Sequence, residues 1–166
     1  MVTKIKFILY VIVLSFIGAS YQALGHRDIS ELGEFEIKLQ VSTNLSVKCF
    51  IKVIKYSADM SHNRCWGSDW SDPRTVIGEL KIWINNKEII VPLSSYADLS
   101  NINWASLKDV HEGYRLHIKG GDAASSYDAT IDFDEIGLFG REVHNGEEPK
   151  VDWEKTIYSR DTTSIY

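Results

Sequence analysis

Apolar and polar residues alternate with a period of two through most of this 166-residue chain, and no long stretch has helical periodicity. In the segment 35–41, apolar residues occupy every odd position and polar residues every even one. Similar patterns favour further strands at 47–54, 80–84, 87–91, 114–118, 127–133, 138–143 and 153–158. The chain is therefore predicted to be all-β, with about seven or eight short strands.

Short turn signals separate these segments. Asn85-Asn86 lies between two β-rich segments, and because Asn tolerates positive φ this pair predicts a two-residue hairpin turn. Crossover helices for parallel strands are missing from the pattern, so we expect antiparallel pairing. The stretch 94–107 lacks alternation and is expected to contain a short helical turn near 96–99. A small antiparallel β-sandwich and a partly closed barrel both fit this pattern.

The N-terminus has the composition of an export signal. Lys4 and Lys6 precede an uncharged apolar run at 7–17, and small residues follow at 18–20. A positive region, an apolar core of about 7–15 residues and small residues near a cut site characterise a secretory signal peptide. The apolar run is shorter than the roughly 20 residues of a membrane span, so no stable anchor is expected after cleavage.

Cleavage after Ala23 or Gly25 fits this pattern best, which makes residues 1–25 the predicted signal peptide. The remainder, 26–166, is predicted to be one β-rich domain with a frayed tail after residue 158. The predicted location is therefore secreted or periplasmic.

Composition and charge narrow the range of partners. Hydrophobic residues make up 44% of the chain and charged residues 25%, which is typical of a globular domain. Removing the two signal-peptide lysines moves the formal net charge from −5 to −7. Because an acidic domain repels phosphate backbones, a nucleic acid partner is not expected. A basic protein would instead be attracted to it.

Cys49 and Cys65 are the only cysteines, and both follow the predicted signal peptide. An even number of cysteines in an oxidising compartment predicts a disulfide between them. Neither cysteine belongs to a Cys-x-x-Cys motif, so metal binding or thiol catalysis is not expected.

Two loops are candidate partner-binding segments. The first, at 63–73, combines Trp66, Asp69 and Trp70 with Gly, Ser and Pro. The second combines small and polar residues that allow close approach of a partner: Gly120, Gly121, Asp122, Ser125, Ser126 and Tyr127. Trp83 is a further candidate, because it lies on the strand face opposite Leu80, Ile82 and Ile84. The structural alternatives are tryptophans that cover one end of the sandwich and a plain hairpin connection.

Motifs for catalysis are absent from the sequence. It contains no Gly-x-Ser-x-Gly or Ser-x-x-Lys nucleophile motif, no phosphate-binding loop and no dinucleotide fingerprint. The five histidines lack the spacing of a known metal motif, and no pair of acids is singled out for glycoside hydrolysis. We therefore expect no catalytic residue, cofactor or metal, and binding is favoured over enzymatic activity.

These observations favour an exported domain that occludes a protein partner, as an enzyme inhibitor or a toxin-neutralising immunity protein does. In general character the chain resembles the small periplasmic lysozyme inhibitors, which are β-rich and often disulfide-bonded. Their Ser-Gly-x-x-Tyr loop is absent, and the closest string is 121–127. The alternative is a carbohydrate-binding module that uses Trp66, Trp70 and Trp83 for stacking. A third possibility is a small hydrolase whose site is built from scattered Asp, Glu and His residues.

Overall fold

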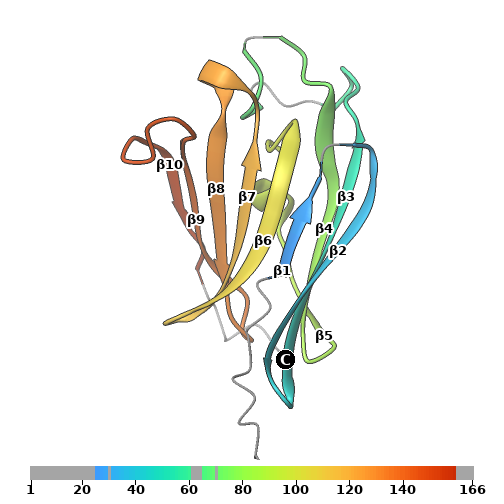
Figure 1. The fold of residues 1–166 in the computed structure, drawn as a ribbon, viewed down its shortest axis with the longest axis vertical. Coiled ribbons are helices and arrows are strands. Elements are labelled where there is room, and N and C mark those ends of the chain that lie inside the picture. Colours follow the sequence, from blue (N-terminus) through green and yellow to red (C-terminus); the bar gives the residue numbers. More distant parts are fainter. Residues whose placement is uncertain (1–24, 30, 61–64, 70, 160–166) are drawn as a thin grey trace, which may run out of the picture.

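The protein was analysed as a computed structural model, which describes residues 25–29, 31–60, 65–69 and 71–159. Most of the predicted signal peptide (1–24), Trp70 and the end of the predicted frayed tail lie outside the described residues. In the described part, ten strands form two antiparallel sheets that face each other and do not close into a barrel (Figure 1). This confirms the predicted antiparallel sandwich and excludes the barrel.

The larger sheet has six strands in the order β1-β6-β7-β8-β9-β10, and the smaller has four in the order β2-β3-β4-β5. The strands are β1 (Gly25–Asp28), β2 (Gly33–Ser42), β3 (Leu45–Lys55), β4 (Thr75–Ile84), β5 (Lys87–Ile89), β6 (Ile102–Val110), β7 (Gly113–Gly120), β8 (Tyr127–Phe133), β9 (Leu138–Asn145) and β10 (Asp152–Ile157). The chain enters through β1, builds the smaller sheet, and returns through the segment 90–101 to complete the larger one (Figure 1).

Alternation along the strands produces the core between the sheets. In the smaller sheet Cys49 pairs with Ile37 on one side and Ile82 on the other, and all three are at most 2% exposed. In the larger sheet the inward row includes Ile118 and Ala129, which are fully buried. The central strands β3, β7 and β8 therefore place about one residue in two in the core, and this burial is the main source of stability.

The predicted hairpin at Asn85-Asn86 is confirmed. The two asparagines have φ angles of 48° and 64°, as the two central residues of a type I′ turn require. Asn85 also ties this turn to the neighbouring hairpin, because its Oδ1 accepts a hydrogen bond from the Ser46 amide at 3.0 Å.

Two strands were not predicted. Strand β1 has only four residues, and β6 has a register shift between Ile102 and Trp104 that interrupts its alternation. The central residues 105–107 of β6 are all buried, including the outward-facing Ser106. The expected helical turn is a 3₁₀ helix at Leu93–Ser95, earlier in the chain than predicted, with a further turn at 96–98.

The predicted disulfide is wrong, because Cys49 and Cys65 are not bonded. Cys49 lies inside the core, opposite Ile82 of β4. Cys65 precedes Trp66, which forms a β-bridge with Leu99. The next residue, Ser100, forms a β-bridge with Val76 at the other end of β4. Val76 and Ile82 are six residues apart, a rise of about 20 Å along a strand, whereas the Cα atoms of a disulfide lie within about 7 Å.

Alkylation without reductant tests this correction. We expect both thiols to be modified after unfolding in denaturant, because no bond protects them. In the folded protein Cys49 should resist modification, because it is fully buried and burial raises the pKa of its thiol. Intact mass with no adducts after unfolding would contradict the structure.

Candidate functional site

Four connections lie at the same end of the sandwich, at the top of Figure 1. They follow β1, β3, β7 and β9, and their described residues together are called the loop end. Both loops singled out from the sequence belong to it. The turns that follow β2, β4, β6 and β8 lie at the opposite end (Figure 1).

The two predicted loops touch each other through glycines. A Cβ added to Gly121 would lie 2.9 Å from the Cα of Gly67, and both glycines have positive φ. Asn101 joins them: its Nδ2 donates to the Gly67 carbonyl at 2.7 Å, and its own carbonyl accepts from the Gly121 amide at 2.9 Å. Asn103 Nδ2 donates to the Gly121 carbonyl at 2.7 Å. Hydrogen bonds therefore hold the loops in one arrangement.

The β9–β10 connection is attached to the same group. The Gly146 amide donates to the Ser126 carbonyl at 2.8 Å, and a Cβ on Gly146 would lie only 2.6 Å from the Ser126 hydroxyl. Within the second loop, Ser125 Oγ bonds to the Asp122 carbonyl at 2.8 Å and caps a short 3₁₀ helix, Ala123–Ser125. Three connections that are distant in sequence thus form one fixed surface.

Among the predicted binding residues of the described loop end, only Asp69 and Asp122 are exposed. The others are buried or half-buried and pack the end of the sandwich: Trp66, Gly120, Gly121, Ser125, Ser126 and Tyr127. Tyr127 is 1% exposed, and its hydroxyl donates to the Ser100 carbonyl at 3.1 Å. Burial raises the pKa of this phenol. The accessible groups are therefore carboxylates, and the rings support them.

The tryptophans do not form one platform. Trp66 stacks on Trp153 with 5.2 Å between ring centroids and 15° between planes. Trp83 lies on the outer face of the smaller sheet near the β4–β5 turn, at the opposite end of the molecule (Figure 1). Lys48 Nζ lies 4.2 Å from the centroid of the Trp83 ring, a cation–π contact that covers the ring.

A buried ion cluster lies beneath the loop end. Arg141 of β9 is 2% exposed, and it pairs with Asp98 at 2.7 Å and with Glu154 of the edge strand β10. Thr156 Oγ1 also donates to Glu154, at 2.8 Å. Burial opposes the charge of Glu154, but hydrogen bonds from Thr156, Arg141 and Trp66 and the Arg141 charge lower its pKa.

This cluster connects the core to the loop surface. The Asp98 carbonyl accepts a hydrogen bond from the Trp66 amide at 2.8 Å, and Trp66 stacks on a residue next to Glu154. Arg141 therefore fixes the position of the first loop through Asp98 and the position of β10 through Glu154. Its role is to position these elements, because its guanidinium does not reach the surface.

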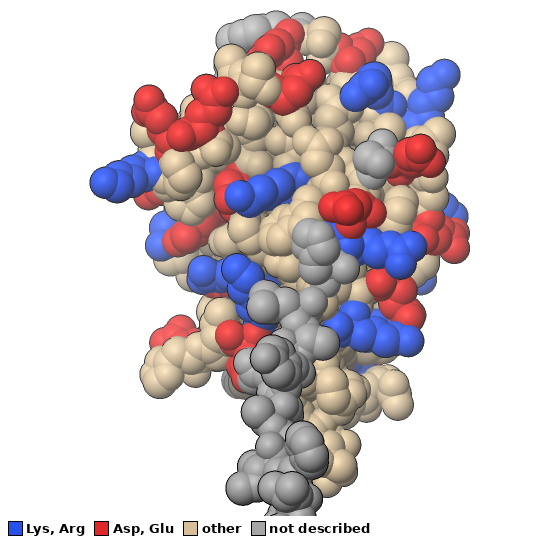
Figure 2. All heavy atoms as spheres, in the orientation of Figure 1, with Lys and Arg blue, Asp and Glu red and all other residues tan. Residues whose placement is uncertain are grey.

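Exposed acids dominate the loop end. Acidic side chains gather over this end in Figure 2, with basic side chains on one flank. Among the described residues of these connections, the exposed carboxylates are those of Glu31, Asp59, Asp69, Asp72, Asp122, Glu147 and Glu148, whereas the bases are Arg74 and Lys150. This excess produces a negative electrostatic field at the described loop end.

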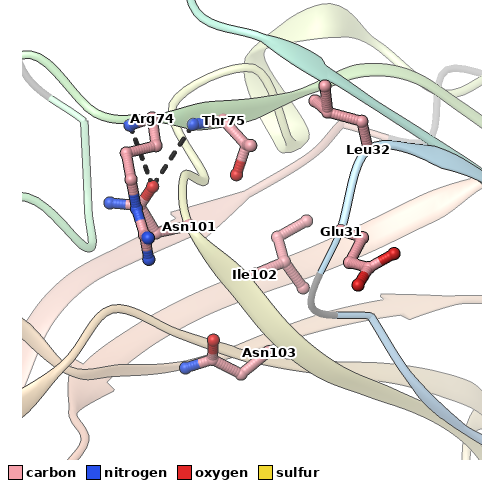
Figure 3. Close-up of a pocket in the computed structure, with 7 residues that line it drawn as sticks. All are labelled: Glu31, Leu32, Arg74, Thr75, Asn101, Ile102 and Asn103. Atoms are coloured by element: carbon pink, nitrogen blue, oxygen red, sulfur yellow. Dashed lines mark hydrogen bonds between the residues drawn. The ribbon is translucent and has the colours of Figure 1, made fainter.

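A half-open pocket of about 410 Å³ lies in the same region, where the β1–β2 connection faces the first residues of β4 and β6 (Figure 3). Arg74 and Asn101 lie on one side, and Glu31 and Leu32 lie on the other. Thr75, Ile102 and Asn103 complete the lining. Its volume is in the range of small-ligand sites, which is about 300–1,000 Å³.

The sequence reasoning missed these pocket residues. Asn101 adopts φ 46°, and its Oδ1 accepts from the Arg74 and Thr75 amides at 3.0 and 3.3 Å. Asn is the commonest non-glycine residue with positive φ, so the sequence Ser-Asn-Ile-Asn at 100–103 signals a special turn. The lack of alternation in this stretch is a second indication that it forms something other than a regular strand.

A row of polar residues on the outer face of the larger sheet has the residue types of a catalytic triad. Ser106, His117 and Asp128 lie on three neighbouring strands, and His117 hydrogen-bonds to Asp128. Ser106 lies directly opposite His117, but its hydroxyl is buried and has no hydrogen bond to a described side chain or backbone group. The surrounding backbone amides belong to the sheet ladder and are not available to bind an oxyanion. The row stabilises the face and lacks the access that a nucleophile needs.

This row makes stability depend on pH. Burial raises the pKa of Asp128, but hydrogen bonding to His117 and the charges of His117 and Lys119 outweigh burial and lower it overall. The lowered pKa contributes stability that is complete above the unfolded value of about 3.9 and is lost as pH falls through the folded value. We expect Asp128→Asn to cost about 1–3 kcal/mol at pH 7 and less at pH 3.

Urea unfolding at a series of pH values measures this difference. The control is Asp109→Asn, an exposed residue of the opposite end, which should leave the profile unchanged. A penalty for Asp128→Asn that stays constant from pH 7 to pH 3 would contradict the assignment.

In the described part of the chain, no group of three or more His, Cys, Asp or Glu side chains is arranged to hold a metal ion. No helix among these residues has the length and hydropathy needed to cross a membrane. Comparisons with protein-family models, curated protein sequences and solved structures find no match for this chain.

Proposed function

We propose that this protein is an exported β-sandwich that binds and occludes a basic protein partner through its loop end. The observation that carries the proposal is the joining of three sequence-distant connections into one fixed, acidic surface. Loops held on a rigid scaffold are the usual place for recognition, because they vary without cost to the core. An inhibitor or a toxin-neutralising immunity protein would use such a surface to cover a cationic active face.

Loops that are already ordered in the free protein favour tight binding. The Gly67–Gly121 contact and the Asn101 and Asn103 hydrogen bonds order the surface before a partner arrives. These loops then lose less conformational entropy when the complex forms, so more of the contact energy appears as affinity. The excess of carboxylates adds faster association at low salt.

Carbohydrate binding is the second candidate. The amide, hydroxyl and charged groups of the pocket are able to bond sugar hydroxyls. However, Trp66 has one ring face against Trp153, and the Trp83 ring lies under Lys48, so neither presents an open platform for a sugar ring. The protein partner is therefore the better-supported reading.

Charge neutralisation at the two ends tests the proposal. The loop-end variant carries Asp69→Asn, Asp122→Asn and Glu148→Gln, and the matched control carries Asp109→Asn, Glu112→Gln and Glu135→Gln at the opposite end; all six residues are exposed. With each protein as bait in the exported fraction at low salt, we expect only the loop-end variant to lose its stoichiometric partner, by about tenfold or more. Equal recovery by both variants, or retention on a polysaccharide resin instead, would count against the proposal.

A further inference from the structure

The pocket at the loop end has opposite charges on its two sides. Arg74 and Glu31 are both exposed, and they lie on opposite sides of the cavity (Figure 3). Neither side chain forms an ion pair or a side-chain hydrogen bond with any described residue. Many other charges are paired, as in Arg115 with Asp132 and Lys52 with Glu34. Two residues of opposite charge, neither paired with a described residue, thus line one cavity.

The groups between the charges are amphipathic. Thr75 and Asn103 provide polar groups, and Leu32 and Ile102 provide apolar surface. Asn101 is already committed, since its amide makes three hydrogen bonds within the protein. Recognition of a ligand therefore falls to Arg74 and Glu31 at the sides, to Thr75, and to the Oδ1 of Asn103, whose Nδ2 already donates to the Gly121 carbonyl.

The size of the cavity selects a ligand length. A sphere of about 410 Å³ is about 9 Å across, which matches two or three extended residues at about 3.3–3.6 Å each. We propose that this pocket binds a short zwitterionic peptide, whose carboxylate faces Arg74 and whose ammonium group faces Glu31. A guanidinium binds a carboxylate through two parallel N–H donors, and a carboxylate accepts readily from an ammonium group.

Ligands with a single charge are less suitable. A purely anionic ligand would approach the Glu31 carboxylate, and a purely cationic one would approach the Arg74 guanidinium. In both cases the like charge opposes binding in a partly desolvated cavity. Only a ligand with both charges, separated by roughly the width of the cavity, matches both sides.

NMR titration of the isotopically labelled full chain with triglycine tests the proposal. We expect saturable shifts at Arg74, Thr75 and the Asn103 side-chain amide. N-acetyl-triglycine and triglycine amide each lack one terminal charge and should bind about two- to fivefold more weakly, the effect of one exposed ion pair. Glu31→Gln should abolish the penalty of acetylation only, and Arg74→Gln should abolish the penalty of amidation only.

The control variant is Glu112→Gln at the opposite end, which should leave all three affinities unchanged. Equal affinities for free and blocked peptides, no saturable shift up to about 20 mM, or tighter binding of a neutral monosaccharide would each overturn the proposal. The titration involves no protein partner, so its failure leaves the proposed function standing, and the reverse is equally true.

Discussion

Replacing Arg141 by methionine is expected to destabilise the protein by about 3–5 kcal/mol, because it leaves two partly buried carboxylates without their cation. The guanidinium is 2% exposed, whereas Asp98 and Glu154 are only about one-third exposed. Without Arg141, both acids keep the cost of partial burial and also repel each other. Urea unfolding at pH 7 measures the loss as a shift of the midpoint.

Arg115→Met is the matched control. Arg115 also binds a carboxylate through two hydrogen bonds, to Asp132 at 2.6 and 2.7 Å, but on the outer face where its side chain is 38% exposed. Solvent screens this pair, so the expected loss is below about 1 kcal/mol. If the two variants lose similar stability, the Arg141 cluster does not behave as a buried one.

A triple variant separates the charge effect from packing. Arg141→Met combined with Asp98→Leu and Glu154→Leu removes all three charges and keeps the volume. Because buried ion clusters are often replaceable by apolar residues, most of the lost stability should return. If the triple variant stays as unstable as Arg141→Met, the loss comes from packing.

The fold was largely predictable because its strands bury one face. Alternation makes a strand recognisable in the sequence wherever one side meets the core and the other meets solvent. In β2, for example, Ile37 and Leu39 are buried between exposed neighbours. In β6, the register shift between Ile102 and Trp104 breaks the alternation, and only the short run from Ala105 to Lys108 retains it. A strand interrupted by a bulge is therefore hard to recognise from sequence periodicity.

The site was less predictable because it depends on contacts between distant segments. Composition identified two loops, but not that Asn101 ties Gly67 to Gly121 across the sandwich end. Arg141 had a signal that was overlooked: it shares a strand face with Val143, a core position. An arginine at such a position requires carboxylates nearby to balance its charge. Which acidic residues provide them depends on the tertiary structure.

The disulfide prediction failed for a related reason. Two cysteines and an export signal favour a bond on statistical grounds. However, Cys49 is a core residue of a central strand, and small buried cysteines pack as ordinary hydrophobic residues. The register of β3 and β4, which decides the distance between the cysteines, becomes visible only once the strands are paired.

Gly67→Ala is expected to cost about 2–5 kcal/mol and to separate the two loops of the proposed binding surface. Gly67 has φ 92°, a conformation that alanine adopts only with strain. Its Cβ would lie 2.6 Å from the Ser100 carbonyl and 2.8 Å from the Tyr127 ring. Since the carbonyl is backbone and the ring is fully packed, neither moves aside cheaply. Thermal unfolding and loop-end partner recovery measure the two effects.

Substitutions at two further glycines separate the cost of backbone strain from the cost of the steric clash. Gly137 has φ 157° but no atom within 4 Å of an added Cβ, so Gly137→Ala tests backbone strain alone. Gly140 has only an ordinary contact, 3.7 Å from the Asp132 side chain, and Gly140→Ala should change stability by less than about 0.5–1 kcal/mol. If Gly67→Ala costs no more than Gly137→Ala, the clash is relieved and the loops are not tightly joined. If it costs more and partner recovery also falls, the glycine contact is what holds the binding surface in shape.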